Sequence, residues 1–208
     1  MLINSNNKPV RIVGIGTMPN DLKDFLTEER IPVTVHRLED VQNDPAADQY
    51  QYLVMTIKSL PLRAKILDWI DQSGLHVPIY IHDRAYVVDP GSLQPGSIIF
   101  PMASVLKCML GRHTLITSNC HIAHCVEMAD RCITLPGSLV CGSVRLSKNT
   151  LLQIGSTVKD NVTISAEGVN LLPRSLVTKN IDITGTYGGT PARRINSSSC
   201  LESDYWNQ

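Results

Sequence analysis

Three histidines, His113, His121 and His124, lie close together near the middle of the chain. A neutral imidazole can accept a proton from an amine or a hydroxyl near pH 7, because the unperturbed pKa of histidine is near 6.5. Such a base needs an orienting partner, often a carboxylate. Glu127 and Asp130 follow His124 closely. These residue types indicate proton transfer from a nucleophile, with His124 as the base that we predict and with Glu127 and Asp130 both open as its carboxylate.

A six-residue repeat must position these histidines. Compact residues such as Cys120 and Val126 stand two places before each large one. Residues i and i−2 of a strand share one face, so both registers predict core positions. The large positions follow steps of six, with one step of five and one of seven, and Thr134 alone is polar: Ile81, Val87, Leu93, Ile99, Val105, Leu110, Ile116, Ile122, Met128, Thr134, Val140, Leu146, Leu152, Val158, Ile164, Leu171, Val177 and Ile183.

This hexapeptide repeat is typical of a parallel β-helix, in which stacked coils bury one continuous core. Three short strands per coil require about 18 residues, so the repeat predicts about six coils. His113, His121 and His124 lie off both inward registers. We therefore expect all three at exposed corners or on outward faces.

Residues 9–80 follow a different pattern, in which apolar β-type runs alternate with helical periodicity. Alternation of this kind predicts a small, Rossmann-like α/β unit with a parallel sheet. The expected strands are residues 10–16, 31–35 and 52–57, the expected helices are 20–30 and 60–72, and residues 77–81 are expected to close the unit. The predicted domains are 1–80 (α/β), 81–195 (β-helix) and 196–208 (a polar tail).

The first predicted strand ends in the turn Gly14-Ile15-Gly16-Thr17. Amides at the start of the following helix could bind an anion such as a phosphate. The turn lacks the third glycine of a dinucleotide fingerprint, so a tight strand-to-helix turn is an equally open interpretation.

The composition excludes several classes of function. The formal net charge is zero, so the chain has no basic footprint for nucleic acid. No apolar run approaches the roughly 20 residues that span a bilayer. The N-terminal segment is polar and does not have the pattern of a signal peptide. We expect a cytoplasmic protein without nucleic-acid or membrane partners.

Three of the six cysteines, Cys108, Cys120 and Cys132, occupy the compact inward register. A thiol in such a position behaves as a small hydrophobic group. The sequence has no CxxC pair, so we expect no structural zinc site and no metal cofactor.

Several segments in combination resemble the sugar O- and N-acetyltransferases of the sialic acid and bacillosamine pathways, in the left-handed β-helix, hexapeptide-repeat superfamily. The resemblance covers nearly the whole chain. It rests on Arg63-Ala64-Lys65-Ile66, Ile81-His82-Asp83-Arg84-Ala85-Tyr86-Val87, His124, Leu135-Pro136-Gly137-Ser138-Leu139-Val140-Cys141-Gly142, Ser175-Leu176-Val177-Thr178-Lys179-Asn180 and Gly189-Thr190-Pro191-Ala192-Arg193.

The resemblance implies a homotrimer that binds acetyl-CoA as co-substrate in the cleft between neighbouring subunits. It implies that His124 takes a proton from the attacking amine or hydroxyl of a sugar, in surface-glycan biosynthesis. The Gly142 amide would then donate to the thioester oxygen as it becomes an oxyanion.

The resemblance also implies a ligand-binding role for each end of the chain. The N-terminal domain would bind a nucleotide sugar through its first turn, at Gly14, Gly16 and Thr17. The C-terminal segment would lie near the CoA nucleotide, with Arg193 a candidate for its phosphates. The cofactor-binding residues implied are Gly142, Gly189, Pro191, Ala192 and Arg193.

The chain departs from the family around the histidine. Ala123 and Cys125 flank His124 where the family usually has an acidic residue, so the orienting carboxylate is missing or has moved to Glu127. Thr117 and Ile133 replace a family asparagine and a second family histidine. We keep both as substrate-binding candidates.

Two other functions stay open. A β-helix trimer that binds CoA or a nucleotide sugar without efficient chemistry would act as a binding or scaffold protein. A zinc hydratase would need three histidines that converge between subunits, and the spacing of His121 and His124 does not resemble that site.

Overall fold

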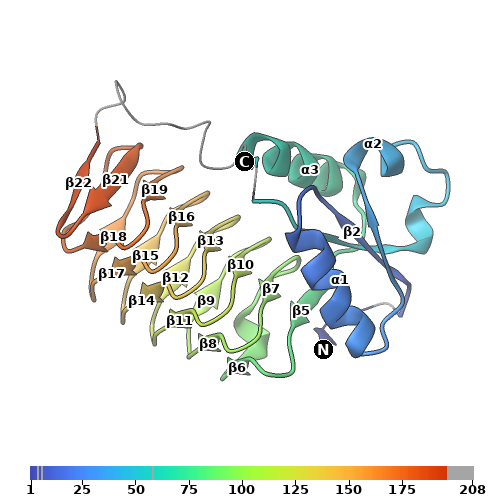
Figure 1. Cartoon of the computed structure of the whole chain (residues 1–208), viewed down its shortest axis with the longest axis horizontal. Helices are drawn as coiled ribbons and strands as arrows, with labels where there is room; N and C mark the ends of the chain where they lie inside the picture. Colours follow the sequence, from blue (N-terminus) through green and yellow to red (C-terminus); the bar gives the residue numbers. More distant parts are fainter. Residues whose placement is uncertain (4, 6, 58, 196–208) are drawn as a thin grey trace. The chain divides into compact units, whose positions relative to one another are not determined.

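The computed structural model describes residues 1–195 except 4, 6 and 58, so the predicted polar tail at 196–208 lies outside the described residues (Figure 1). The chain divides into two compact units, the first within Met1–Ile79 and the second beginning at Tyr80. Within the described part of the chain, no helix combines the length and the apolar character that crossing a membrane requires.

The first unit is built on a three-stranded parallel sheet in the order β3-β2-β4, with Val10 paired to both Val33 and Gln51. Its elements confirm the predicted alternation of strands and helices. They are β1 (Leu2–Ile3), β2 (Val10–Val13), α1 (Met18–Glu28), β3 (Val33–His36), α2 (Leu38–Val41), the 3-10 helix η1 (Ala47–Gln49), β4 (Gln51–Val54) and α3 (Leu60–Ser73).

Local signals explain where α3 begins and ends. The Ser59 hydroxyl accepts a hydrogen bond from the Leu62 amide at 3.3 Å, and Pro61 lies in the first turn. Gly74 ends the helix in the left-handed conformation, with φ 62°. The helix packs on one face of the sheet, in a core of Val13, Leu38, Val41, Tyr52, Val54, Ile66, Leu67, Ile70 and Val77.

The prediction that residues 77–81 close this unit is wrong. The Tyr52 amide donates to the His76 carbonyl at 2.8 Å, so the chain follows β4 only briefly. Pro78 then offers no N–H to a neighbouring strand. The next residues form β5 (Ile79–Ile81), in which Tyr80 pairs with Ile98 of the second unit. The small sheet therefore has three strands.

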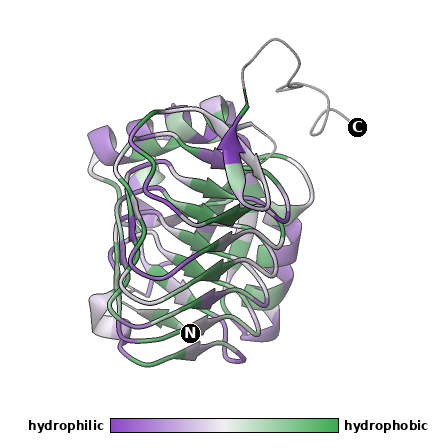
Figure 2. Ribbon diagram, turned by 90° about the vertical axis from the view of Figure 1, so that its left-hand side faces the viewer, coloured by the Kyte–Doolittle hydropathy of each residue, from purple (hydrophilic) through white to green (hydrophobic). Residues whose placement is uncertain are grey.

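The second unit is a β-solenoid in which three parallel sheets run along the stack of coils (Figures 1 and 2). Sheet 1 contains β5, β7 (Ile98–Ile99), β10 (Leu115–Ile116), β13 (Ile133–Thr134), β16 (Leu151–Leu152), β19 (Asn170–Leu171), β21 (Thr186–Gly189) and β22 (Ala192–Arg194). Sheet 2 contains β6 (Tyr86–Val87), β8 (Ser104–Val105), β11 (His121–Ile122), β14 (Leu139–Val140), β17 (Thr157–Val158) and β20 (Leu176–Val177). Sheet 3 contains β9 (Met109–Leu110), β12 (Glu127–Met128), β15 (Arg145–Leu146) and β18 (Thr163–Ile164), and the 3-10 helix η2 spans Pro90–Ser92. Sheet 2 is six-stranded, which agrees with the predicted number of coils.

The core of the solenoid confirms the two inward registers. Ile116, Ile122 and Val140 are fully buried. Thr134 is also fully buried, and its hydroxyl donates to the Leu115 carbonyl at 3.5 Å. Cys108, Cys120 and Cys132 are buried as predicted, at 5%, 1% and 0% exposure. The green strands in Figure 2 show this hydrophobic interior along the stack.

Tight corners join the sheets, and many of them hold a non-glycine residue at positive φ. Between sheets 2 and 3, Cys125, Ser143 and Asn161 have φ of 58°, 59° and 60°. That conformation costs roughly 1–2 kcal/mol per residue. A hydrogen bond from each of these amides to the preceding coil offsets the cost, as from Cys125 to Lys107 at 2.8 Å.

The repeat differs from prediction at its end. Ile183 was expected to point inward, but it is 52% exposed, whereas Ile181 is 5% exposed and bridges Ile164. The step from Val177 to Ile181 is 181 − 177 = 4 residues, against 164 − 158 = 6 between Val158 and Ile164 one coil earlier. The last corner is therefore two residues shorter, which shifts the register. The chain then forms an antiparallel hairpin of β21 and β22.

Candidate active site

His124 lies at the corner between β11 and β12, where sheet 2 gives way to sheet 3. The backbone on both sides of it is fixed. The Ala123 amide donates to the Val140 carbonyl at 2.9 Å, and the Cys125 amide donates to the Lys107 carbonyl at 2.8 Å. The His124 side chain itself is exposed. The solenoid thus holds a solvent-accessible imidazole on a rigid corner.

Gly142 occupies the same corner one coil further along. The Ser143 amide donates to the His124 carbonyl at 3.0 Å, which sets the register of the two coils. A Cβ placed on Gly142 would lie 2.9 Å from Cε1 and 3.1 Å from Nε2 of the His124 ring. Only a glycine leaves room for the imidazole here, although the φ of Gly142 is not left-handed.

The Gly142 amide is available as a donor. Among the described residues no acceptor for this N–H is found, whereas its carbonyl accepts from the Asn161 amide at 3.0 Å. An exposed imidazole and an N–H without an acceptor in the described part of the chain thus lie side by side. This pairing can accept a proton from a nucleophile while the amide donates to a developing oxyanion.

Glu127 is engaged elsewhere. Its carboxylate pairs with Arg145, whose Nε and Nη2 lie 3.3 and 3.4 Å from Oε2 and Oε1. The two residues are register partners on sheet 3. In the part of the chain that the structure describes, no hydrogen bond or ion pair joins Glu127 to His124. A catalytic role for Glu127 stays a prediction, and the 18-residue spacing to Arg145 is the sequence signal that would have revealed its partner.

The other two histidines are not brought to this corner. His113 is buried, at 2% exposure, and lies against Gly96, so the expectation that it is exposed is wrong. His121 is partly exposed on sheet 2, where it pairs with Ser104 and Leu139. Within one chain the three histidines therefore do not form a shared ligand set.

Thr117 and Ile133 are both buried, at 1% and 2% exposure. The Thr117 hydroxyl donates to the Thr134 carbonyl at 2.8 Å, at the corner between sheets 1 and 2. Ile133 belongs to β13 of sheet 1. Neither residue shares the corner of His124 within the chain, and their substrate-binding roles stay predictions.

The predicted CoA-nucleotide residues lie on the terminal hairpin. Gly189 and Ala192 are register partners, and Pro191 lies in the two-residue loop between them. Arg193 is exposed, and its guanidinium donates to the Ala192 carbonyl at 2.9 Å. The hairpin therefore presents a cation at the surface, which is what phosphate binding requires.

The glycine turn links β2 directly to α1. Gly14 is needed because a Cβ there would lie 2.7 Å from the Met55 carbonyl carbon, across the sheet. Gly16 has φ 92°, and Thr17 is the N-cap of α1 without a side-chain capping bond. These observations confirm a tight turn at a helix start, and phosphate binding by it stays a prediction.

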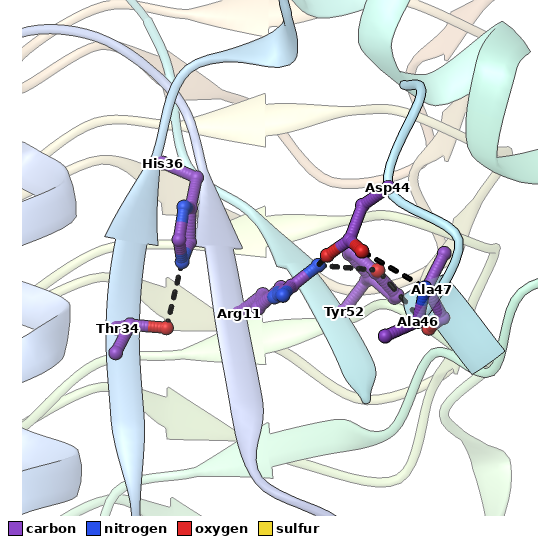
Figure 3. A network of polar contacts seen from close by, with 7 residues as sticks. All are labelled: Arg11, Thr34, His36, Asp44, Ala46, Ala47 and Tyr52. Carbon is purple, nitrogen blue, oxygen red and sulfur yellow. Dashed lines mark hydrogen bonds and ion pairs between the residues drawn. The ribbon is translucent and has the colours of Figure 1, made fainter. Parts of the chain in front are cut away.

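A polar network on the first unit was not expected from the sequence (Figure 3). Arg11 of β2 pairs with Asp44 at 2.5 Å, donates to the Tyr52 hydroxyl at 3.4 Å and stacks over the Tyr50 ring at 3.5 Å. The Ala46 amide and the Arg11 guanidinium hold the pKa of Asp44 below its usual value. Arg11 contacts Asp44, Tyr50 and Tyr52 in this network. These three residues all lie within residues 44–52, so Arg11 anchors the segment that follows α2 to the sheet.

A second histidine borders this network. His36, at the end of β3, is 2.8 Å from the Thr34 hydroxyl (Figure 3). Burial lowers the pKa of His36, and the positive charge of Arg11 lowers it further. Burial likewise raises the pKa of Tyr52. The amide of Gly14, a predicted substrate-binding residue, donates to the His36 carbonyl at 3.1 Å, so the glycine turn adjoins this sheet edge.

Comparison with protein-family models gives no match, and comparison with curated protein sequences gives none either. Solved structures do match. The acetyltransferase domain of PglB from Neisseria gonorrhoeae FA1090, in complex with acetyl coenzyme A, superposes with a TM-score of 0.81 at 17% identity, over 91% of this chain and 100% of that one. The chain has the fold of this acetyltransferase.

Two further solved structures have the same fold. A mutant of perosamine N-acetyltransferase from Caulobacter crescentus, in complex with CoA and GDP-perosamine, gives a TM-score of 0.77 at 18% identity, over 95% of this chain and 100% of that one. WeeI from Acinetobacter baumannii AYE gives 0.64 at 15% identity, over 90% and 100%. The chain therefore shares its fold with the acetyltransferase domain of PglB and with perosamine N-acetyltransferase.

Proposed function

We propose that the chain is an acetyltransferase that transfers the acetyl group of acetyl-CoA to an amino or hydroxyl group of a nucleotide-linked sugar. The observation that carries the proposal is the contact between His124 and Gly142. It joins a base and an oxyanion donor at an exposed corner. The solved neighbours that bind acetyl-CoA or CoA with GDP-perosamine share this fold.

The reaction would proceed with His124 as general base. The imidazole accepts the proton of the attacking amine or hydroxyl as the new bond to the acetyl carbon forms. The thioester oxygen becomes an oxyanion and accepts a hydrogen bond from the Gly142 amide. When the C–S bond breaks, the proton passes from His124 to the CoA thiolate. Atoms and charge balance without any further reactant.

The remaining predicted residues complete the proposal. Arg193 on the terminal hairpin would pair with the CoA phosphates, and the hairpin residues Gly189, Pro191 and Ala192 would line the nucleotide site. The turn at Gly14, Gly16 and Thr17 would bind the nucleotide of the acceptor at the start of α1.

The assembly belongs to the same proposal. We place the chain in a left-handed β-helix trimer, in which the acceptor site lies next to the buried Thr117 and Ile133, at the contact with a neighbouring subunit. The support is the hexapeptide repeat and the architecture shared with the solved acetyltransferases. Sedimentation analysis tests it, and a monomeric protein with full activity would contradict it.

A second function is favoured by one observation. Glu127 pairs with Arg145, and Ala123 and Cys125 on either side of His124 carry no carboxylate. A chain without any orienting acid would bind CoA or a nucleotide sugar and turn it over poorly. This describes a binding or scaffold protein.

Mass spectrometry separates the two functions. The wild-type protein is mixed with acetyl-CoA and a panel of UDP-, dTDP- and GDP-linked amino sugars, sialic acid-like sugars and simple hexoses. We expect one acceptor to gain the mass of an acetyl group in step with CoA release. CoA binding measured by calorimetry, without product from any acceptor, would favour the scaffold function instead.

A further inference from the structure

The outward face of sheet 1 is buried, unlike the outward faces of sheets 2 and 3. Neighbouring side chains of a strand point to opposite faces, so the residue before each inward residue points outward. On sheet 3 such an outward residue, Met109, is 59% exposed. On sheet 1 the outward residues form an apolar stripe of Ile98 at 1%, Leu115 at 1%, Ile133 at 2% and Leu151 at 5% exposure.

Another part of the same chain must cover this apolar stripe. Each exposure is that of a single chain, so the covering atoms belong to that chain. Among the described helices and strands, the close neighbours of β7, β10, β13 and β16 are other strands of sheet 1. The cover therefore comes from a part of the chain outside these elements.

The described chain ends on this same face. Leu172 follows the inward Leu171, so its side chain points outward from sheet 1. A Cβ placed on Gly188 would lie 2.9 Å from Cδ1 of Ile195 and 3.1 Å from Cδ1 of Leu172. The Ile195 side chain therefore packs beside Leu172, over the space that Gly188 leaves. Residue 196 thus begins at the edge of the face that needs a cover.

The length of the remaining chain fits this face. After Ile195 the sequence continues for 208 − 195 = 13 residues. An extended chain spans about 3.3 Å per residue, so these residues reach about 43 Å. From β21 to β7 the face covers five strand spacings of about 4.8 Å, or about 24 Å. Three side chains of the segment bury well on an apolar surface: Leu201, Tyr205 and Trp206.

The charges beside this face complement those of the segment. Arg112, Arg131 and Lys148 lie at the corner that leads into sheet 1, on three successive coils. An acid of the same corner, Asp130, accepts a hydrogen bond from the Arg112 amide at 2.8 Å. The segment has no basic residue, and its acidic residues are Glu202 and Asp204.

We propose that the C-terminal segment, residues 196–208, docks along the outward face of sheet 1 and covers the apolar stripe. It runs from β21 toward β7. At about 3.3 Å per residue Leu201 reaches as far as Leu115, and Trp206 reaches Ile98. The contact needs no substrate, so it goes beyond the proposed function. Because Ile133 belongs to the stripe, an acceptor bound next to it would also border the segment, a consequence that rests on the proposed function.

Quenching of tryptophan fluorescence tests the docking. Trp69 and Trp206 are the two tryptophans of the chain, so Trp69→Phe leaves Trp206 as the only reporter. We expect acrylamide to quench Trp206 several-fold less in the folded protein than in the same protein unfolded in urea. Leu115→Gln in this background places a polar group under the segment and should restore quenching toward the unfolded value. Met109→Gln changes an outward position of sheet 3 and should leave Trp206 protected.

A second measurement leaves the face unchanged, so it holds even where Leu115→Gln fails to fold. Nuclear Overhauser cross-peaks between the Trp206 ring and the methyl groups of Ile98 or Leu115 report the contact directly. We expect them in the wild-type chain. We expect none in a sample refolded from two kinds of chain, one labelled only in these methyl groups and the other only in the ring.

Three results would contradict the proposal. Trp206 that is quenched as strongly in the folded as in the unfolded protein would exclude docking, as would a stripe without cross-peaks to the segment. Cross-peaks in the mixed sample would show that the segment covers a second copy and not its own chain. Each of these results leaves the proposed acetyl transfer untouched, because neither measurement uses a substrate.

Discussion

The imidazole of His124 lies against the backbone of Gly142 one coil further along the solenoid, so closely that a Cβ on Gly142 would come within 2.9 Å of Cε1. The site needs a glycine at position 142, because any side chain there would collide with the imidazole. The contact also places the Gly142 amide beside His124, the exposed histidine that the family resemblance identifies as the base. Among the described residues this amide has no hydrogen-bond acceptor.

Gly142→Ala tests that contact. The new methyl group would push the imidazole away, and we expect turnover to fall at least tenfold. The fold should survive with a change in unfolding free energy below about 1 kcal/mol, since the φ of Gly142 suits any residue. Initial rates and thermal unfolding check both expectations.

Gly91→Ala is the matched control for that variant. Its Cβ would meet only a side-chain oxygen of Asp89, at 3.3 Å, and its φ is not left-handed. It should keep wild-type turnover. Equal turnover in Gly142→Ala and wild type would show that the position of the imidazole does not depend on Gly142.

Gly14→Ala should damage the first unit. The added methyl group would overlap the backbone carbonyl of Met55, and because Gly14 and Met55 directly follow the paired strands β2 and β4, the backbone there cannot yield without cost. Overpacking of this kind costs roughly 1–3 kcal/mol. Urea unfolding followed by hydrogen exchange should locate the loss in residues 10–77. An unchanged unfolding midpoint would contradict the tight contact between β2 and the chain after β4.

The repeat could be read largely from the sequence, because the solenoid core demands one residue type at each inward position. Even Thr134 and Cys120 take the expected inward places, and the hydroxyl of Thr134 and the thiol of Cys120 donate to backbone carbonyls. Ile183 could not be placed correctly, since a corner shortened by two residues leaves no mark in the hydrophobic pattern.

The site was less predictable than the fold. His113 lies off both inward registers, yet it is buried against Gly96. The spacing of residues in the repeat cannot predict a contact of this kind between two corners of the solenoid. The pairing of Glu127 with Arg145 follows from coil stacking, and the 18-residue spacing of the two residues is the sequence signal that predicts it. His124 and Gly142 were found because the resemblance named both.

The cysteines should differ in reactivity according to burial. Burial raises the pKa of the Cys108 thiol to about 12, and it also raises the pKa of Cys141. Only the thiolate reacts with alkylating reagents. At pH 8 we expect the exposed Cys125 to be labelled first among the described cysteines, and Cys108 to stay unlabelled until the protein unfolds. Peptide mass mapping measures this order, and early labelling of Cys108 would contradict the buried position.

Asp44 should make the first unit sensitive to acid. Its pKa lies below the usual value because the Ala46 amide and Arg11 favour the charged form. The stability that it contributes is therefore present above about pH 4 and is lost as the pH falls through its lowered pKa. Asp44→Asn should be less stable than wild type at pH 7, with a difference that shrinks below about pH 4.

Urea unfolding at several pH values measures this difference. Asp48→Asn is the control, since Asp48 is an exposed residue of the same loop. A stability difference between Asp44→Asn and wild type that stays constant from pH 7 to pH 3 would contradict a role of the Arg11–Asp44 pair.

The central claim is that His124 is the general base of an acetyl transfer. The most direct test is the single-turnover rate of acetyl transfer from bound acetyl-CoA to an accepted sugar, in wild type and His124→Asn at saturating substrates. Positioned base catalysis contributes about 10²–10⁴-fold, so we predict a loss of that size with the fold and CoA binding retained. Equal rates in the two proteins would contradict the account and remove His124 from the mechanism.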